Sequence, residues 1–328
     1  MSNEYRYGFR VFGALSNPRA LVAWDRAFVD ACACRVAARP GEESYLSAFC
    51  FGPDFRQYLR ETGSVRGYDG ATWARYVWFD VDRTSIRRAR LDAARLVDVV
   101  AARYCAPEDD LLLFFSGCKG FHVGVPTALC GAEPSPDFHR DARRFAERIA
   151  ELARVNIDTA IYDRARAFRA PNSRHPKTGL YKRRLTFAEL CGLSPSEIQT
   201  AAQRPLPFLP PGLPGEIQAA AEADWLEAAA QQQQRKRATA SFCPAADAPT
   251  PNGRVNALTT DFIRHGAPEG ERALRLFAAA ANLAEAGTPP DVITALLHPA
   301  ARDSGLAPSE IRRQIECGIQ HAQKGGDQ

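Results

Sequence analysis

Two apolar runs that almost touch in the sequence constrain the fold most. The segments DLLLFFSG (110–117) and FHVGVP (121–126) are rich in aromatic and branched residues, and three residues separate them. Such runs are typical of strands. A parallel pair needs a crossover of a dozen or more residues, so these two strands are predicted to pair antiparallel through a tight turn.

The neighbouring segments alternate between strand and helix patterns. Apolar residues that recur every three or four positions predict helices, and aromatic or β-branched runs predict strands. Mixed elements with antiparallel pairing indicate an α+β fold, with an antiparallel or mixed sheet flanked by helices. The predicted elements are a strand at 76–82, a helix from Thr84 or Ser85 to Tyr104, a helix from Phe138 to Leu152, and strands at 156–163 and 180–187.

A change of composition after residue 205 predicts the domain boundaries. The 328 residues exceed one average domain. Residues 206–255 are rich in Pro and Gln and contain a helical stretch near 217–230, which indicates a linker with a short helix. From residue 256 to 328 the pattern is helical throughout. We therefore expect an α+β domain at 1–205 and a small all-α domain at 256–328.

The composition excludes several classes of protein. Nine scattered cysteines without a CxxC pair favour reduced thiols over a disulfide framework, and a zinc site at Cys32 and Cys34 is the weaker alternative. The N-terminus lacks a signal-like apolar stretch, and no run of about 18 apolar residues occurs. We therefore expect a cytoplasmic protein without a membrane partner.

Asp80 and Asp82 end the predicted strand at 76–82, two positions apart. A period of two puts both side chains on one face, where two carboxylates repel each other unless a cation lies between them. A pair of merely solvated aspartates is the alternative. The apolar run YVWF before them makes two unpartnered anions costly, so a metal site is favoured.

The turn between the two central strands carries Ser116, Lys119 and His122 beside two glycines. Glycine lets the backbone approach a ligand closely, and a hydroxyl, an ammonium group and an imidazole suit phosphate oxygens. An ordinary hairpin turn with an incidental histidine is the alternative for this segment alone.

A basic segment follows Asp158. Residues 164–184 hold eight Lys or Arg and no Asp or Glu, with apolar residues between them. A solvated charged face is the common explanation of such a run, but the interleaved apolar residues favour a strip that binds phosphates. Asp163 lies five residues after Asp158 and competes with it as an acidic ligand. Strict strand alternation would put the two on opposite faces.

Together these segments resemble the archaeo-eukaryotic primase superfamily. The resemblance is carried by Phe79-Asp80-Val81-Asp82, by Ser116 to His122, and by Ile157-Asp158 with the basic residues after it, in the family's order. Residues 256–322 resemble the helical domain that follows the catalytic domain in plasmid and phage primases. The resemblance covers about residues 40–190 and 256–322.

The resemblance implies a DNA primase-polymerase that synthesises and extends primers by two-metal nucleotidyl transfer. Two Mg²⁺ or Mn²⁺ ions and a single-stranded DNA template are implied, and the helical domain either helps initiation or docks onto a replicative helicase. A two-metal nuclease or phosphohydrolase and a non-catalytic single-stranded nucleic-acid-binding module are the alternatives. The implied catalytic metal ligands are Asp80, Asp82 and Asp158, and the implied binders of the nucleoside triphosphate are Ser116, Lys119, His122, Arg166, Arg169 and Lys177.

Overall fold

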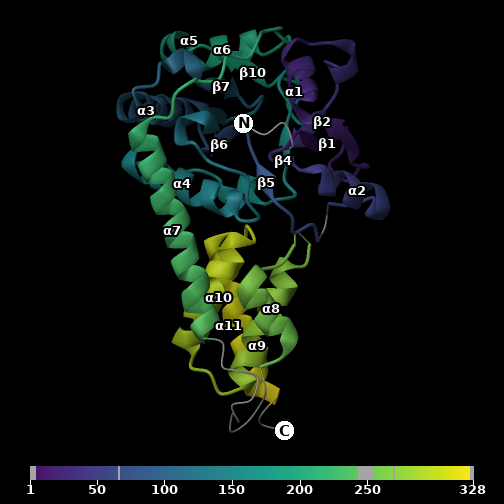
Figure 1. Cartoon of the computed structure of the whole chain (residues 1–328), viewed down its shortest axis with the longest axis vertical. Helices are drawn as coiled ribbons and strands as arrows, with labels where there is room; N and C mark the ends of the chain where they lie inside the picture. Colours follow the sequence, from purple (N-terminus) through teal and green to yellow (C-terminus); the bar gives the residue numbers. More distant parts are fainter. Residues whose placement is uncertain (1–4, 66, 243–254, 269, 326–328) are drawn as a thin grey trace. The chain divides into compact units, whose positions relative to one another are not determined.

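The computed structural model describes residues 5–65, 67–242, 255–268 and 270–325 of the chain (Figure 1). It divides into two compact units, Met1–Ala229 and Ala230–Gln328. The first unit contains all the strands of the described residues, and the second is helical. The protein is therefore α+β, with antiparallel sheets flanked by helices and a helical C-terminal part, as the sequence predicts.

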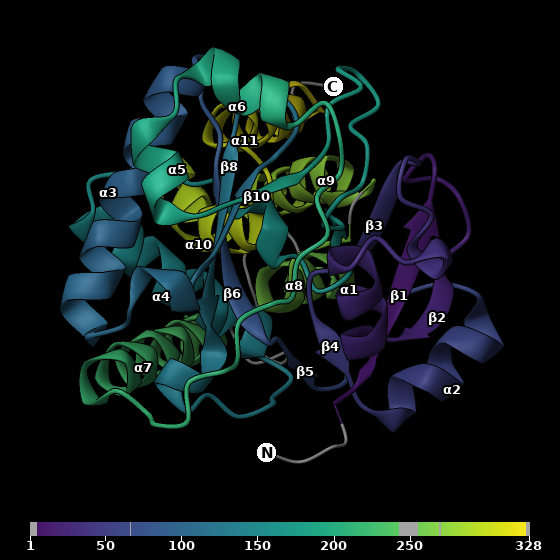
Figure 2. The same ribbon diagram turned by 90° about the horizontal axis from the view of Figure 1, so that it is seen from above.

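A six-stranded antiparallel sheet occupies one half of the first unit. Its order is β5-β4-β1-β3-β9, with β2 paired to β1. Helices α1 (Trp24–Cys32) and α2 (Pro53–Thr62) pack against it, as Figure 2 shows. The sequence patterns did not predict this sheet, whose strands are β1 (Tyr7–Phe12), β2 (Ala20–Ala23), β3 (Ser44–Ser47), β4 (Cys50–Phe51), β5 (Thr72–Trp73) and β9 (Ala167–Arg169).

A four-stranded antiparallel sheet forms the other half, in the order β10-β7-β8-β6. The hairpin of β7 and β8 confirms the antiparallel pairing predicted from the short link. Helices α3 (Ile86–Tyr104) and α4 (Phe138–Leu152) pack on this sheet (Figure 2). The strands are β6 (Tyr76–Val81), β7 (Leu112–Phe115), β8 (Phe121–Pro126) and β10 (Arg183–Leu185).

The core of the first unit is aromatic and continuous. Phe79, Phe114, Phe115 and Phe145 are each fully buried, which is the burial expected of a strand or helix covered by a second layer. After β10 come two short helices, α5 (Phe187–Gly192) and α6 (Pro195–Ala201). Each begins with a capping box, in which a hydroxyl and a glutamate satisfy the first backbone amides.

Two segments differ from the sequence prediction. The strand predicted at 156–163 is wrong, because Thr159–Tyr162 form a 3₁₀ helix, η4, that Asp158 caps by accepting from the Ala160 amide. The short helix predicted near 217–230 is longer, since α7 runs over Ala219–Phe242. Gln, Arg, Lys and Ala are good helix formers, so low complexity does not prevent a helix here. Residues 243–254 of the predicted linker lie outside the described residues.

In the described residues of the second unit after α7, four helices pack around a small apolar core. They are α8 (Ala257–His265), α9 (Arg272–Glu285), α10 (Pro290–Asp303) and α11 (Pro308–Gly325). Their core contains Phe262, Leu276, Leu297 and Ile311, all fully buried. Among the described residues, no helix combines the length and the apolar character needed to cross a membrane.

Candidate active site

The acidic end of β6 lies against the start of β8. The two strands pair antiparallel with Asp80 opposite His122, and β6 ends one residue later, just before Asp82. The Oδ1 atom of Asp80 is 3.5 Å from Nε2 of His122. The Asp80 side chain is 23% exposed, so it lies at the boundary between the core and the surface.

Asp158 reaches the same place from a distant part of the chain. Its backbone amide donates to the carbonyl oxygen of Asp80 at 2.8 Å. Burial is the largest cause, and the charges of Asp158 and Asp82 act in the same direction, so that together they raise the pKa of Asp80 to about 7. The structure thus brings near one another the three aspartates that the sequence singled out, because the charges of Asp158 and Asp82 both act on Asp80.

Asp163 has a different environment. Its Oδ1 atom accepts from the backbone amide of Ala165 at 3.0 Å, and Asp158 and Asp82 are the carboxylates that raise the pKa of Asp80 most. The two aspartates do not lie on opposite faces of one strand, because η4 separates them. Asp158, which the family resemblance favours, is the one whose backbone contacts Asp80.

The turn between β7 and β8 is closed by its own backbone. The amide of Ser116 donates to the Gly120 carbonyl at 3.0 Å, and the Gly120 amide donates to the Ser116 hydroxyl at 3.2 Å. A Cβ at Gly120 would lie 2.9 Å from the Val81 carbonyl oxygen and 3.2 Å from Oδ1 of Asp82. Only glycine therefore lets this turn approach the acidic end of β6.

Lys119 extends from this turn to the carboxylates. Its ammonium nitrogen is 3.4 Å from Oδ2 of Asp82, and both side chains are about half exposed, at 49% and 46%. An ion pair this exposed contributes little to stability. The ammonium group can exchange partners and is available to a phosphate.

His122 is the buried member of the site. It is 5% exposed, its ring lies 4.5 Å from that of Phe168 between centroids, and its Nδ1 atom has no hydrogen-bond partner among the described residues. Burial lowers the pKa of His122 well below its ordinary value, and the charges of Lys182 and Arg169 lower it further. The imidazole is therefore neutral, with one nitrogen able to donate.

The predicted basic strip is only partly gathered at this place. The charge of Arg166 lowers the pKa of Asp80, which puts this arginine near the carboxylates. Arg169 is held by the Arg174 carbonyl at 3.2 Å and the Tyr45 hydroxyl at 3.3 Å, and its charge acts on His122. Both arginines adjoin the junction of the two sheets.

Lys177 lies elsewhere, on the exposed loop 174–179, which lines a cavity of about 490 Å³ together with Gly41 and Glu43. The loop adjoins the turn after β7, because the Thr178 hydroxyl donates to the Gly117 carbonyl at 2.5 Å. Within this loop the backbone amide of Lys177 donates to Nδ1 of His175 at 3.2 Å.

Lys182 is a charged residue of the site that the sequence did not single out. It is 1% exposed, and its ammonium nitrogen lies 4.0 Å from the ring centroid of Phe168 and 5.0 Å from that of Trp78. Burial lowers the pKa of Lys182 well below its ordinary value, Arg169 lowers it further, and Asp80 raises it. Its place within the basic run of residues 164–184 was the available signal, although a buried lysine cannot be recognised from that pattern.

The donor set suits a hard divalent cation. Carboxylate oxygens are the ligands that Mg²⁺ and Mn²⁺ prefer. A cation between Asp80, Asp82 and Asp158 would offset the repulsion that raises the pKa of Asp80. In the described part of the chain, no three His, Cys, Asp or Glu side chains already surround a metal position, and this holds for the zinc alternative at Cys32 and Cys34 as well. The three aspartates suit these ions by charge and ligand type, but their carboxylates do not surround a single metal position in this structure.

Comparison with known proteins gives distant likenesses. No protein-family model and no curated protein matches the sequence. The crystal structure of the primase RepB′ aligns over 99% of this chain and 95% of its own, with 15% identity and a TM-score of 0.36. The polymerase domain of Mycobacterium tuberculosis ligase D, in complex with DNA, aligns over 48% of this chain and 58% of its own, with 18% identity and a TM-score of 0.32. The roles below are therefore argued from the site itself.

Proposed function

We propose that the chain is a primase-polymerase, which joins nucleotides on a single-stranded DNA template and starts strands without a primer. One observation carries the proposal: Asp158 is hydrogen-bonded through its backbone to Asp80, and Asp158 and Asp82 together raise the pKa of Asp80. Carboxylates collected at such an energetic cost are typical of a site for divalent metal ions.

Asp80, Asp82 and Asp158 would hold two Mg²⁺ or Mn²⁺ ions. When bound, these ions would favour ionisation of the attacking 3′-hydroxyl and stabilise the charge on the leaving pyrophosphate. In the reaction the 3′-oxygen forms a bond to the α-phosphorus of a nucleoside triphosphate. The bond from that phosphorus to the bridging oxygen breaks, and the hydroxyl proton is released to solvent.

The basic and neutral donors suit the triphosphate. Lys119 can leave Asp82 for a phosphate, because their ion pair is half exposed. His122 is neutral and can donate its one N–H to a phosphate oxygen. Being uncharged, it would not repel the metal ions. Ser116 holds the turn, and Arg166 and Arg169 add positive charge at the junction of the two sheets.

Lys177 is proposed as a more distant phosphate contact, since its loop adjoins the turn that carries Lys119. The cavity beside this loop is lined by Arg174, His175 and Lys177, and Glu43 is the acidic residue among its lining. The basic side chains of this lining outnumber the acidic one, so the cavity favours an anion. The phosphates of a nucleoside triphosphate or of a DNA strand would provide one.

Primer synthesis on unprimed single-stranded DNA tests the proposal. The wild-type protein is expected to make products with Mg²⁺ or Mn²⁺ and none with a chelator, and Asp80→Asn and Asp82→Asn are each expected to abolish synthesis. Arg60→Ala, which removes an exposed charge from α2, is the matched control and keeps full activity. Product formation by both asparagine variants would refute the proposal. Shortening of labelled DNA without nucleotides would favour the nuclease instead.

A further inference from the structure

A second cavity lies at the other end of the β6 and β8 pair. Arg75 comes directly before β6 and Thr127 directly after β8, whereas Asp80 and His122 face each other at the opposite end. Five residues of extended strand from Arg75 to Asp80 span about 16 Å. The cavity has a volume of about 550 Å³, within the usual range for small-molecule sites.

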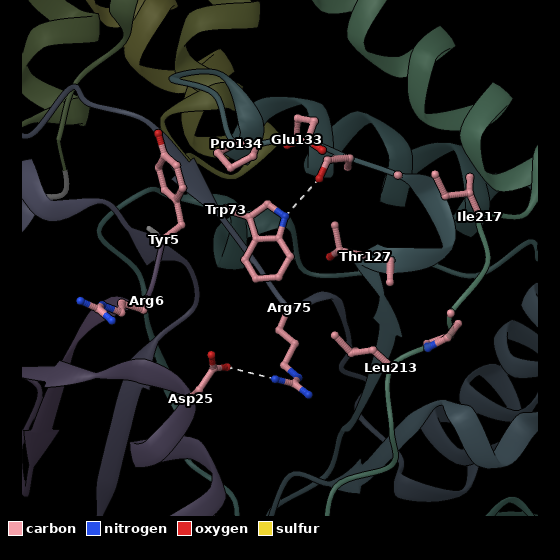
Figure 3. Close-up of a pocket in the computed structure, with 15 residues that line it drawn as sticks. Tyr5, Arg6, Asp25, Trp73, Arg75, Thr127, Glu133, Pro134, Leu213 and Ile217 are labelled. Carbon is pink, nitrogen blue, oxygen red and sulfur yellow. Dashed lines mark hydrogen bonds and ion pairs between the residues drawn. The ribbon is translucent and has the colours of Figure 1, made fainter. Parts of the chain in front are cut away.

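Trp73 provides a fixed aromatic wall. Figure 3 shows its indole ring between Pro134 and Glu133 on one side and Arg75 on the other. Its Nε1 atom donates to the Ala132 carbonyl at 3.1 Å, and β5 holds its backbone against Cys50 of β4. The indole is partly exposed, while the other three tryptophans of the chain are buried. A planar ligand would therefore find a stacking face already in position.

A buried hydroxyl without a partner points to a polar ligand. Thr127 is 1% exposed and lines the cavity, yet its Oγ1 atom has no hydrogen-bond partner among the described residues. Native proteins satisfy nearly all buried polar groups, so this hydroxyl on the cavity wall indicates a ligand with a hydrogen-bonding edge.

The charges around the cavity favour a ligand whose buried part is neutral. Arg75 is paired with Asp25 at 3.2 Å, as Figure 3 shows, and the remaining charged side chains of the lining are Arg6 and Glu133. Two basic and two acidic groups cancel formally. A fully buried phosphate would lack a compensating charge, whereas a neutral planar ring would not need one.

We propose that this cavity binds one unstacked nucleobase, with its face on Trp73 and its polar edge toward Thr127 and Arg75. A base combines the planar face and the donor and acceptor edge that these residues require. The proposal rests on the proposed function in one respect, since a protein that works on single strands meets unstacked bases. The base belongs either to a free nucleoside or to a strand, and the sugar and phosphate would point toward the exposed Arg6.

Binding of a labelled short oligothymidylate, measured by fluorescence anisotropy without divalent ions, tests the inference. Trp73→Ala is expected to raise the Kd about tenfold or more, because stacking on one aromatic ring is typically this strong. Trp73→Phe retains a ring and should lose less. Thr127→Val keeps the shape and should raise the Kd about fivefold, the effect of one hydrogen bond. Arg60→Ala is the control for a lost surface charge and should bind as the wild type does.

Competition by thymidine or adenosine identifies the source of the base. If a nucleoside displaces the oligonucleotide from the wild type, the cavity accepts free nucleosides. If only oligonucleotides compete, the base comes from a strand. Wild-type affinity in both Trp73→Ala and Thr127→Val, with unchanged unfolding temperatures, would overturn the inference. The proposed function would survive that result, because primer synthesis and the Asp80→Asn variant test it separately.

Discussion

The ammonium group of Lys182 donates a hydrogen bond to the carbonyl oxygen of Arg169 at 2.8 Å, although Lys182 is 1% exposed. The rings of Trp78, Phe114 and Phe168 surround this cation within 5.0 Å of their centroids. Lys182 joins the start of β10 to β9, so it connects the two sheets beside Asp80. Its charge lowers the pKa of Asp80 and of His122.

Lys182→Met is expected to lower nucleotide incorporation at neutral pH about tenfold. Loss of the ammonium charge should raise the pKa of Asp80, so that less of the ionised carboxylate is available. An apolar replacement of a buried charge is often neutral or stabilising, so the unfolding temperature should change little. Primer extension as a function of pH checks this. Its midpoint should move to higher pH in the variant, and an unchanged profile would contradict the assignment.

Asp158→Asn and Asp163→Asn are expected to differ sharply. Asp158 adjoins Asp80 and raises its pKa, whereas Asp163 accepts from the Ala165 amide within its own loop. Asp158→Asn should lose synthesis and extension at least about a hundredfold, the usual effect of removing a group that stabilises charge in the transition state. Asp163→Asn should retain activity within a few fold. The reverse order of the two variants would assign the third acidic ligand to Asp163.

Gly120→Ala tests the contact between the turn and the acidic end of β6. The added methyl group would lie 2.9 Å from the Val81 carbonyl oxygen, a backbone atom that cannot move alone. We expect Asp82 and Lys119 to shift and activity to fall about tenfold or more, since small misplacements at an active site are costly. Gly192→Ala is the matched control, because a Cβ there meets no atom within 4 Å. Equal activity of the two variants would argue against the tight approach.

Asp224 of α7 should stabilise the first unit in a pH-dependent way. It is 2% exposed and accepts from Arg103 at 2.8 Å, Tyr104 at 2.9 Å and Arg148 at 3.0 Å. Burial alone would raise the pKa of Asp224, but these hydrogen bonds outweigh it and lower the pKa. A lowered carboxyl pKa stabilises the fold above the unfolded value of about 3.9, and this contribution is lost as the pH falls through the folded value.

Asp224→Asn is therefore expected to cost about 3–5 kcal/mol in the free energy of unfolding at pH 7, as for a broken buried ion pair. Denaturant titrations should show the difference from the wild type shrinking below about pH 4. Glu227→Gln is the control. Its carboxylate pairs with the same Arg148 at 2.9 Å but is 48% exposed, so its loss should cost about 0–1 kcal/mol.

Removal of residues 256–328 tests the proposed role of the helical part. The helices of this region have their own apolar core, so their loss should leave the core of the first unit intact. We expect extension of a supplied primer to persist and synthesis without a primer to fall at least about tenfold, if these helices help initiation. Equal retention of both activities would favour docking to a helicase or another replication partner.

The four-stranded sheet was predictable because the sequence patterns of its strands are local. The antiparallel pairing of β7 with β8 follows from the short link at residues 116–120, which is too short for a parallel crossover. The helix over Ile86–Tyr104 follows from its periodicity. These features depend on neighbours in the sequence, which a single chain displays directly.

The rest depends on contacts between distant segments. Strands as short as β4, β5 and β9 contain two or three residues, too few for a periodic pattern. Asp158 caps η4, and its backbone amide donates to the carbonyl oxygen of Asp80 in a distant part of the sequence. The burial of Lys182 depends on three aromatic rings contributed by β6, β7 and β9. The neighbouring residues in the sequence do not reveal which distant segment each of these residues contacts.

The position of β9 has a consequence for how the chain is made. Tyr45, Leu46 and Ser47 of β3 pair with Arg169, Phe168 and Ala167 of β9, which lie 120 or more positions later in the sequence. During synthesis the outer edge of β3 therefore stays unpaired until residue 169 has left the ribosome. An open strand edge favours aggregation, and contacts so far apart slow folding. Products that stop before β9 should accumulate as insoluble protein, whereas those that extend through α6 should not.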